Sequence, residues 1–165
     1  MNNTEQSYYP VIKQKIFELF QSKGREIYLE ITANKRFSNR IKSKIPESRQ
    51  IIFSFLGDVR PDITGFIVED IFSDFVIIEI KNERLKLGHI YQARKYADLF
   101  EAKFTFLVSS KEIPVEIERL AKVTHSLLYA STIYKSLALT HFDTETESFE
   151  DWYPENPFEK EYYWR

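Results

Sequence analysis

The sequence predicts an α/β fold in which a mixed β-sheet is flanked by helices, and two observations lead to this class. Residues 75–80 and 104–108 are short, almost wholly apolar segments, as expected of strands that are buried on both faces. Between them, residues 85–100 carry apolar side chains at helical spacing. Such a strand, helix, strand unit implies a parallel pair of strands joined by a right-handed crossover, inside a sheet that helices cover.

The N-terminal part of the chain predicts one helix and one strand. In residues 9–23 the apolar side chains recur at helical spacing. They are Ile12, Ile16, Leu19 and Phe20. Pro10 lies in the first turn, where its missing N–H costs nothing, and Gly24 marks the end of the helix. Residues 27–31 then alternate as in a strand.

The next segment is basic. Residues 35–49 contain six cations, one acid and almost no apolar periodicity, which predicts a basic loop or a loosely ordered segment. Residues 51–56 and 59–68 are strand candidates. Gly57-Asp58 lies between them in a turn position, so the simplest connection is a hairpin.

The C-terminal part predicts a further helix over residues 114–122 and a last strand over residues 131–139. The length of 165 residues and a hydrophobic content of 43% suit one domain with one core, which we expect to span residues 1–148. Residues 149–165 form an acidic tail rich in aromatic residues. We expect this tail to pack on the domain or on a partner subunit in a homodimer.

Composition narrows the function classes. The chain has no cysteine, which excludes disulfides, thiolate zinc sites, iron–sulfur clusters and a cysteine nucleophile. No run of about 18 apolar residues is present, so we expect no membrane partner and a cytoplasmic location. No glycine-rich phosphate loop is present either, which argues against ATP-driven work.

The net charge of -2 conceals an uneven distribution. The segment 143–165 holds eight of the 25 acidic residues but only two of the 23 basic ones. The rest of the chain therefore has 21 basic and 17 acidic residues, a net charge of +4. A nucleic-acid partner is compatible with that body.

Three charged residues near strand ends form the candidate site. Glu79 and Lys81 end an apolar strand, and residues two apart on a strand share a face, so both side chains project to the same side. Charges there are costly unless they are paired or bind a ligand. Asp62 follows Pro61, and we expect it beside Glu79 if the two strands are neighbours. Pro61 would interrupt the strand ladder at an edge or a bulge.

Converging carboxylates predict a divalent cation. Hydrolysis of a phosphodiester needs such a cation to activate water and to neutralise developing charge, and hard cations take oxygen ligands. A second Glu-x-Lys triplet, residues 101–103, falls at a helix end, where we expect it to be solvated. The alternative for the first triplet is a structural ion pair between Asp62 and Lys81 in an inactive protein.

Three short motifs together resemble the PD-(D/E)XK superfamily of restriction-endonuclease-like nucleases. They are Pro61-Asp62, Glu79-Ile80-Lys81 and Gln92-Ala93-Arg94-Lys95-Tyr96. The resemblance covers the central half of the chain and implies a restriction-endonuclease-like mixed β-sheet core flanked by helices. It also implies that Mg²⁺ (or Mn²⁺) is held by Asp62, Glu79 and the backbone carbonyl of Ile80, with Lys81 beside the nucleophilic water.

The resemblance adds a catalytic helix and a further glutamate. Gln92 and Tyr96 share one helical face, as in recombination and repair members, although Tyr96 alone also suits a half-buried core position. Many members add a glutamate ligand from the first helix. Glu5 and Glu30 are favoured here over Glu18.

The expected function is therefore a metal-dependent nuclease that hydrolyses phosphodiester bonds, with DNA as the expected partner. The alternative is a catalytically inactive nucleic-acid-binding or protein-interaction module that retains the fold. Five basic residues are candidates for phosphate contact, as opposed to a solvated loop: Lys35, Arg36, Arg40, Lys42 and Lys44.

Overall fold

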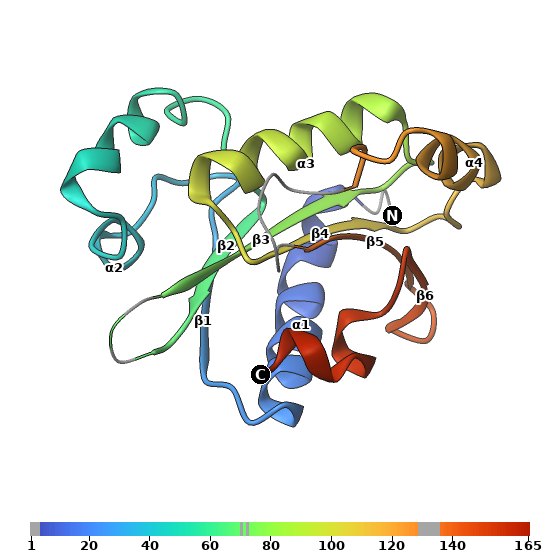
Figure 1. Ribbon diagram of the computed structural model, residues 1–165, viewed down its shortest axis with the longest axis horizontal. Helices are drawn as coiled ribbons and strands as arrows, with labels where there is room; N and C mark the ends of the chain where they lie inside the picture. The colour runs from blue at the N-terminus through green and yellow to red at the C-terminus, as the bar shows by residue number, and fades with distance from the viewer. Residues whose placement is uncertain (1–3, 70, 72, 129–135) are drawn as a thin grey trace.

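The computed structural model describes residues 4–69, 71, 73–128 and 136–165. One six-stranded sheet, in the order β1-β2-β3-β4-β5-β6, forms the centre of the molecule, and helices lie on both of its faces (Figure 1). The α/β class with a mixed sheet flanked by helices, predicted from the sequence, is confirmed.

The elements follow one another along the chain with short connections. The strands are β1 (Ile27–Ile31), β2 (Ile63–Ile67), β3 (Asp74–Lys81), β4 (Phe104–Ser109), β5 (Ser136–Asp143) and β6 (Ser148–Tyr153). The α-helices are α1 (Tyr9–Ser22), α2 (Asn39–Lys42), α3 (Leu87–Phe100) and α4 (Val115–Val123). The 3-10 helices are η1 (Glu5–Tyr8), η2 (Glu47–Ser54), η3 (Pro157–Glu159) and η4 (Glu161–Tyr163).

The sheet is antiparallel at both ends and parallel in the middle. β1 pairs with β2 and β2 with β3 in antiparallel fashion, whereas β3, β4 and β5 are parallel. β6 returns antiparallel to β5. The parallel pair expected from the strand, helix, strand unit is confirmed as β3 and β4, joined by α3.

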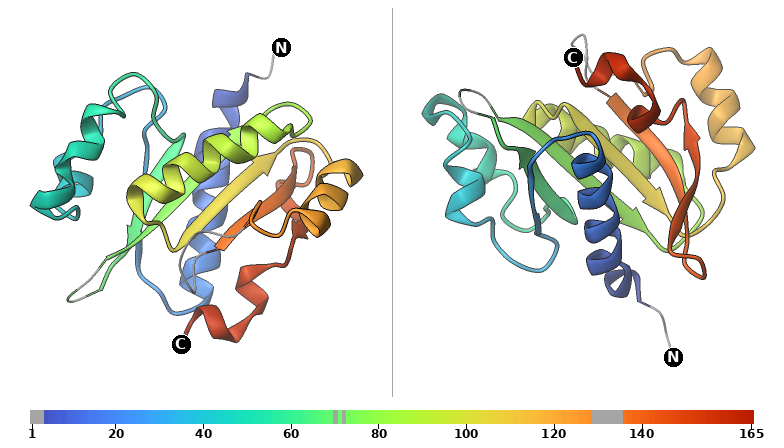
Figure 2. Two further views of the ribbon diagram at one scale, coloured as in Figure 1. Left: turned by 45° about the horizontal axis from the view of Figure 1, so that its top comes forward. Right: turned by 90° about the horizontal axis from the view of Figure 1, so that it is seen from below.

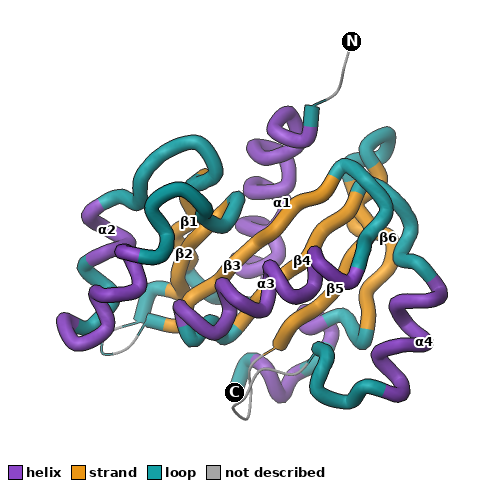
Figure 3. Tube along the Cα trace, turned by 90° about the horizontal axis from the view of Figure 1, so that it is seen from above, coloured by secondary structure: helices purple, strands orange, loops and turns teal. Residues whose placement is uncertain are grey.

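Each face of the sheet has its own cover. α1 packs on one face through its apolar stripe, and α3 and α4 lie on the other (Figures 2 and 3). The stripe consists of Tyr9, Ile12, Ile16 and Phe20, all buried. Alternate residues of β3 supply the two sides, since Val76, Ile78 and Ile80 meet the α1 layer while Ile77 meets the other.

Residues 149–165 are part of this architecture. They contain most of β6 and both C-terminal 3-10 helices, which lie beside α1 (Figure 1). Trp164 packs edge-to-face on Phe20 with 5.4 Å between ring centroids, and Phe158 is buried in the same cluster. Aromatic pairs of this geometry stabilise by about 1 kcal/mol beyond the area that they bury. The aromatic residues therefore complete the core on the α1 face.

Two expectations for residues 35–56 are wrong. Residues 51–56 form no strand, because η2 runs from Glu47 to Ser54, and the hairpin at Gly57-Asp58 does not exist. The expectation that residues 35–49 are loosely ordered is also wrong. It contains α2, and its buried side chains Phe37, Ile41 and Ile45 recur four residues apart, a helical spacing that the basic residues conceal.

Two further expected strands have different bounds in the structure. β2 begins only at Ile63, and it lies between β1 and β3, so Pro61 precedes a central strand and marks neither an edge nor a bulge in it. The predicted last strand over residues 131–139 overlaps β5, which runs from Ser136 to Asp143, while residues 131–135 lie outside the described residues. β6 follows β5, so β5 is not the last strand.

Gly65 explains how β1 and β2 approach one another. A Cβ atom at Gly65 would lie 2.0 Å from the backbone oxygen of Tyr28 and 2.5 Å from a methyl group of Leu29. Only glycine leaves room for that contact. Gly65 therefore lets β1 pair closely with β2. It lies two residues after Ile63, the first residue of β2, which directly follows Asp62 of the candidate site.

Candidate active site

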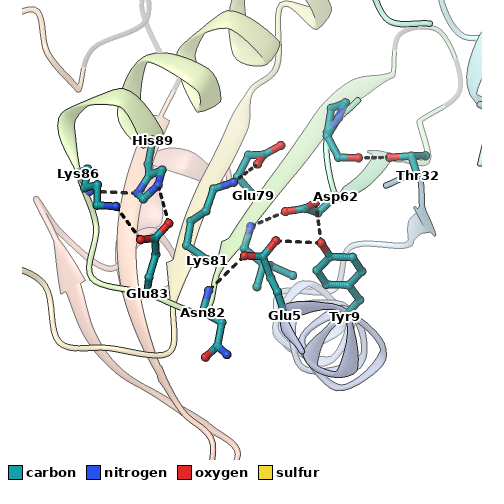
Figure 4. Close-up of polar contacts among 12 residues, drawn as sticks. Glu5, Tyr9, Thr32, Asp62, Glu79, Lys81, Asn82, Glu83, Lys86 and His89 are labelled. Carbon is teal, nitrogen blue, oxygen red and sulfur yellow. Dashed lines mark hydrogen bonds and ion pairs between the residues drawn. The ribbon is translucent and has the colours of Figure 1, made fainter. Parts of the chain in front are cut away.

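The antiparallel pairing of β2 and β3 brings Asp62 to Glu79. Ile63 is the register partner of Ile78, so Asp62, one residue before β2, lies opposite the end of β3. The backbone N–H of Ile80 donates a 2.7 Å hydrogen bond to Oδ2 of Asp62 (Figure 4). The expectation that the two strands are neighbours is therefore confirmed for β2 and β3. Lys81 follows two residues after Glu79 on the same face, as expected from strand geometry.

Glu79 is the most buried charged residue of the site, with 1% of its surface exposed. Its Oε2 lies 3.5 Å from Nζ of Lys81, while Oε1 finds no hydrogen-bond partner among the described residues. Burial, and next the charge of Asp62, raise the pKa of Glu79 to about 8, against the opposing effect of Lys81. Lys81 is thus the partner of Glu79, and one carboxyl oxygen of Glu79 is left over.

Asp62 is held from two sides. Besides the Ile80 N–H, the hydroxyl of Tyr9 donates to Oδ1 of Asp62 at 2.9 Å. Burial raises the pKa of the Asp62 carboxyl, and these two hydrogen bonds oppose that effect. Burial and then the charge of Asp62 also raise the pKa of Tyr9, so its phenol stays a hydrogen-bond donor at neutral pH.

The three candidate glutamates lie in different surroundings. Glu5, in η1, accepts from the hydroxyl of Tyr9 at 3.2 Å and from the backbone N–H of Asn82 at 3.2 Å, so it reaches the site through Tyr9. Glu30 accepts hydrogen bonds from the backbone and hydroxyl of Ser38 and from Tyr28 instead. These contacts turn Glu30 toward α2 and away from Asp62.

Glu18 is placed far from these groups. It accepts from Gln14 on the same helix, and 53% of its side chain is exposed. Of the three glutamates, the structure therefore joins only Glu5 to the hydrogen-bond network of Asp62.

α3 places Tyr96 and His89 above the carboxylates. Tyr96 is fully buried. Burial raises its pKa to about 12, with the Gln92 side chain opposing and the charges of Glu79 and Asp62 adding to the rise. Tyr96 therefore combines the predicted core position with closeness to the site. His89 has partners of its own, because its Nε2 lies 3.3 Å from Oε1 of Glu83 and its Nδ1 accepts from the backbone N–H of Lys86 at 3.0 Å (Figure 4). Burial, followed by the charge of Lys81, lowers the pKa of His89.

The basic segment is divided between two surroundings. The Arg40 guanidinium lies 4.0 Å above the ring of Tyr28, and Nζ of Lys44 lies 5.1 Å from the ring centre of Phe66. Arg36 and Lys42 instead line a cleft beside Arg60, and Lys35 is exposed. Arg40 and Lys44 therefore lie over aromatic rings, whereas Arg36 and Lys42 line the cleft.

Sequence reasoning missed Tyr9 and Arg60. Tyr9 belongs to the buried stripe of α1, so its position in the sequence is that of an ordinary core residue. A buried phenol needs a partner for its hydroxyl, and that requirement was the available signal. Arg60 directly precedes Pro61-Asp62, and its side chain is fixed by backbone carbonyls of Thr32 and Gly57.

The residues present fit a divalent cation. Among the described residues no group of three or more His, Asp or Glu side chains converges as a ready-made metal cage. A Mg²⁺ site, however, needs only one or two carboxylates and keeps several waters. The partnerless Oε1 of Glu79 and the raised pKa values of both carboxyls are the marks of two buried acids that a cation would compensate.

No protein-family model, no curated protein and no solved structure matches this chain. In the described part of the chain, no helix combines the length and apolar character needed to span a membrane.

Proposed function

We propose that this protein is a Mg²⁺- or Mn²⁺-dependent nuclease that hydrolyses phosphodiester bonds in DNA. The observation that carries the proposal is the buried Glu79, which has one oxygen on Lys81 and one without a partner among the described residues, next to a second buried carboxylate, Asp62. The cytoplasm is the proposed location.

Each residue has a distinct role in this proposal. Asp62, Glu79 and the backbone carbonyl of Ile80 would hold the cation. When bound, the cation would activate water and neutralise charge on the phosphate. Lys81, whose side chain is 14% exposed, donates from its ammonium group to the attacking water or to a phosphate oxygen. Tyr9 keeps one oxygen of Asp62 oriented.

The fold supports the resemblance to the PD-(D/E)XK superfamily. α1 precedes a run of antiparallel strands, β1 to β3, and α3 then connects β3 to the parallel β4. Asp62 and Glu79 lie at the adjoining ends of β2 and β3, below the helix that carries Gln92 and Tyr96. We propose on these grounds that the domain is restriction-endonuclease-like.

One observation favours a second candidate, a catalytically inactive module that retains the fold. Both oxygens of Asp62 already accept hydrogen bonds from the protein, and Lys81 already pairs with Glu79. A site that serves only structure would be neutralised in this way.

Cleavage of plasmid DNA with Mn²⁺ separates the two candidates. We expect the wild type to nick plasmid, and Lys81→Ala to lose at least about 100-fold in rate, the magnitude typical of removing one charge-stabilising donor. Lys103→Ala is the matched control, because Lys103 ends the other Glu-x-Lys triplet and pairs with Asp74. Equal cleavage by wild type and Lys81→Ala would contradict the nuclease proposal.

A further inference from the structure

A cationic cleft adjoins the candidate site on the side of α2 and η2. It has a volume of about 300 Å³ and lies between residues of the basic segment, η2 and the chain before Asp62. Three cations, Arg36, Lys42 and Arg60, face a single carboxylate in its lining, that of Asp58. Among the described residues none of these cations forms a salt bridge. The cleft, called the Arg60 cleft below, therefore has uncompensated positive charge.

Arg60 is fixed in place without losing its charge. Its Nε donates to the backbone oxygen of Thr32 at 2.9 Å, and Nη1 donates to the backbone oxygen of Gly57. Both acceptors are neutral, and a guanidinium has five N–H donors, so donors remain for a ligand. Because the side chain is already ordered, binding an anion costs it little further entropy.

The Arg60 cleft is close to the carboxylates. Arg60 lies two residues before Asp62, and two residues of chain span at most about 7 Å. Thr32 ties the segment together, because its hydroxyl donates to the backbone oxygen of Pro61 and its N–H to that of Asp62. Phosphates of one DNA strand follow each other at about 3.4 Å along the helix axis. A phosphate on Arg60 would thus belong to a nucleotide near the cleaved bond.

Aromatic side chains accompany the cations. The half-buried Phe53 lines the Arg60 cleft, with Nζ of Lys42 5.7 Å from its ring centre. Cations that follow the backbone together with exposed aromatic rings are the usual features of single-strand binding, because every unpaired base offers a face for stacking. A base inside a duplex has both faces covered by its neighbours.

We propose that the Arg60 cleft binds one unpaired nucleotide of the nucleic-acid substrate. Arg60, Arg36 and Lys42 take its phosphate, and its base lies against Phe53. The inference rests on the proposed nuclease function for the scissile site and names the substrate class, a strand with a single-stranded segment next to the cleaved bond.

The test measures binding without cleavage. Fluorescence anisotropy is recorded in the Lys81→Ala background, without divalent cation, using a short single-stranded oligonucleotide and the corresponding duplex at several salt concentrations. With Arg36→Gln/Lys42→Gln we expect weaker single-strand binding and a salt slope that is smaller by up to about 0.7, the contribution of the one phosphate that the cleft takes. Both positions are on the surface segment, and thermal unfolding checks that the variant folds.

A second variant tests the base contact. Phe53→Leu should weaken single-strand binding about tenfold and leave duplex binding unchanged, because stacking on the ring of Phe53 is available only to an unpaired base. Thermal unfolding checks that the variant folds, and rescue by Phe53→Tyr would support stacking over a merely structural role.

The matched control is Arg119→Gln/Lys122→Gln, which removes the same charge from exposed positions of α4, at the far end of the sheet from α2 (Figure 1). Equal losses in the control, or equal losses for single strand and duplex together with no effect of Phe53→Leu, would overturn the inference. Because the assay needs neither metal nor Lys81, a failure of the nuclease proposal would show as absent cleavage with the binding differences intact.

Discussion

The two Glu-x-Lys triplets of this chain, residues 79–81 and 101–103, share a sequence pattern and differ in every physical respect. Glu79 and Lys81 lie on one face of a buried strand, with the carboxylate inside the core. Glu101 caps α3 in a left-handed conformation, has 58% of its side chain exposed and pairs with Arg49. A buried carboxylate needs a partner or a ligand, whereas a solvated carboxylate already has water as its partner. Burial and strand geometry, and not the triplet pattern alone, therefore indicate a functional site.

The largest expected difference between the triplets concerns metal binding. We expect Glu79→Gln to weaken Mn²⁺ binding at least about 100-fold, because it removes one of two buried carboxylates while keeping the shape. Glu101→Gln should leave binding unchanged. Isothermal titration of both variants and the wild type gives the values. Identical Mn²⁺ affinities in the three proteins would show that Glu79 does not bind the cation and would contradict the proposed metal site.

The second difference is in how stability depends on pH. The pKa of Glu79 is raised from 4.5 in the unfolded chain to about 8 in the folded protein, so the folded state holds its proton more tightly. Stability is therefore fully present below pH 4.5, falls as pH rises from about 4.5 to about 8, and is constant above that range. Without metal, we expect a loss on the order of a few kcal/mol across this window, measured by denaturant unfolding.

Glu79→Gln provides the control for that experiment, because it should remove the contribution of Glu79 and leave those of other shifted groups, such as Asp62, whose pKa is raised, and His89, whose pKa is lowered. Glu101→Gln should retain the wild-type profile. Coinciding profiles of the wild type and Glu79→Gln between about pH 4.5 and about pH 8 would show that folding does not raise the pKa of Glu79.

A smaller effect is expected for the hydrogen bond that orients Asp62. Tyr9→Phe keeps the buried ring of α1 and removes only the hydroxyl that donates to Asp62 at 2.9 Å. We expect metal affinity and cleavage rate to fall about tenfold, as is usual for groups that orient metal ligands, with little change in substrate affinity. Tyr28→Phe, which removes a hydroxyl bonded to Glu30 on the opposite side of the sheet from α1, should leave both quantities unchanged.

The smallest effect belongs to the solvated triplet. Lys103→Ala breaks a partly exposed ion pair of 3.1 Å with Asp74, and such pairs contribute about 0 to 1 kcal/mol. We expect the free energy of unfolding to drop by less than about 1 kcal/mol and the effect to shrink in 1 M salt. A larger, salt-independent loss would mean that this triplet also has a structural role in the core.

Sequence patterns of sufficient length predicted their elements well. The helices over residues 9–23 and 85–100 and the strands over residues 75–80 and 104–108 are present almost as expected, because long stripes and continuous apolar runs each suit one period only. Residues 51–56 failed for the opposite reason. Ile52 and Leu56 point inward at helical spacing while Ile51 and Phe55 are exposed, and so short a run is compatible with a strand until its partners are known.

The chain by itself determined that Glu79 and Lys81 share a face and end a buried strand, because the period of two is a local property of extended backbone. Only the tertiary structure decided which side chains surround Glu79 and Lys81. Asp62 needed the pairing of β2 with β3, Tyr9 and Glu5 needed α1 to pack on one face of the sheet, and Arg60 needed the carbonyl of Thr32. The contacts of Asp62 with Ile80 and with Tyr9 and the contact of Arg60 with Thr32 join residues 18, 53 and 28 positions apart, and no local spacing specifies contacts made at that range.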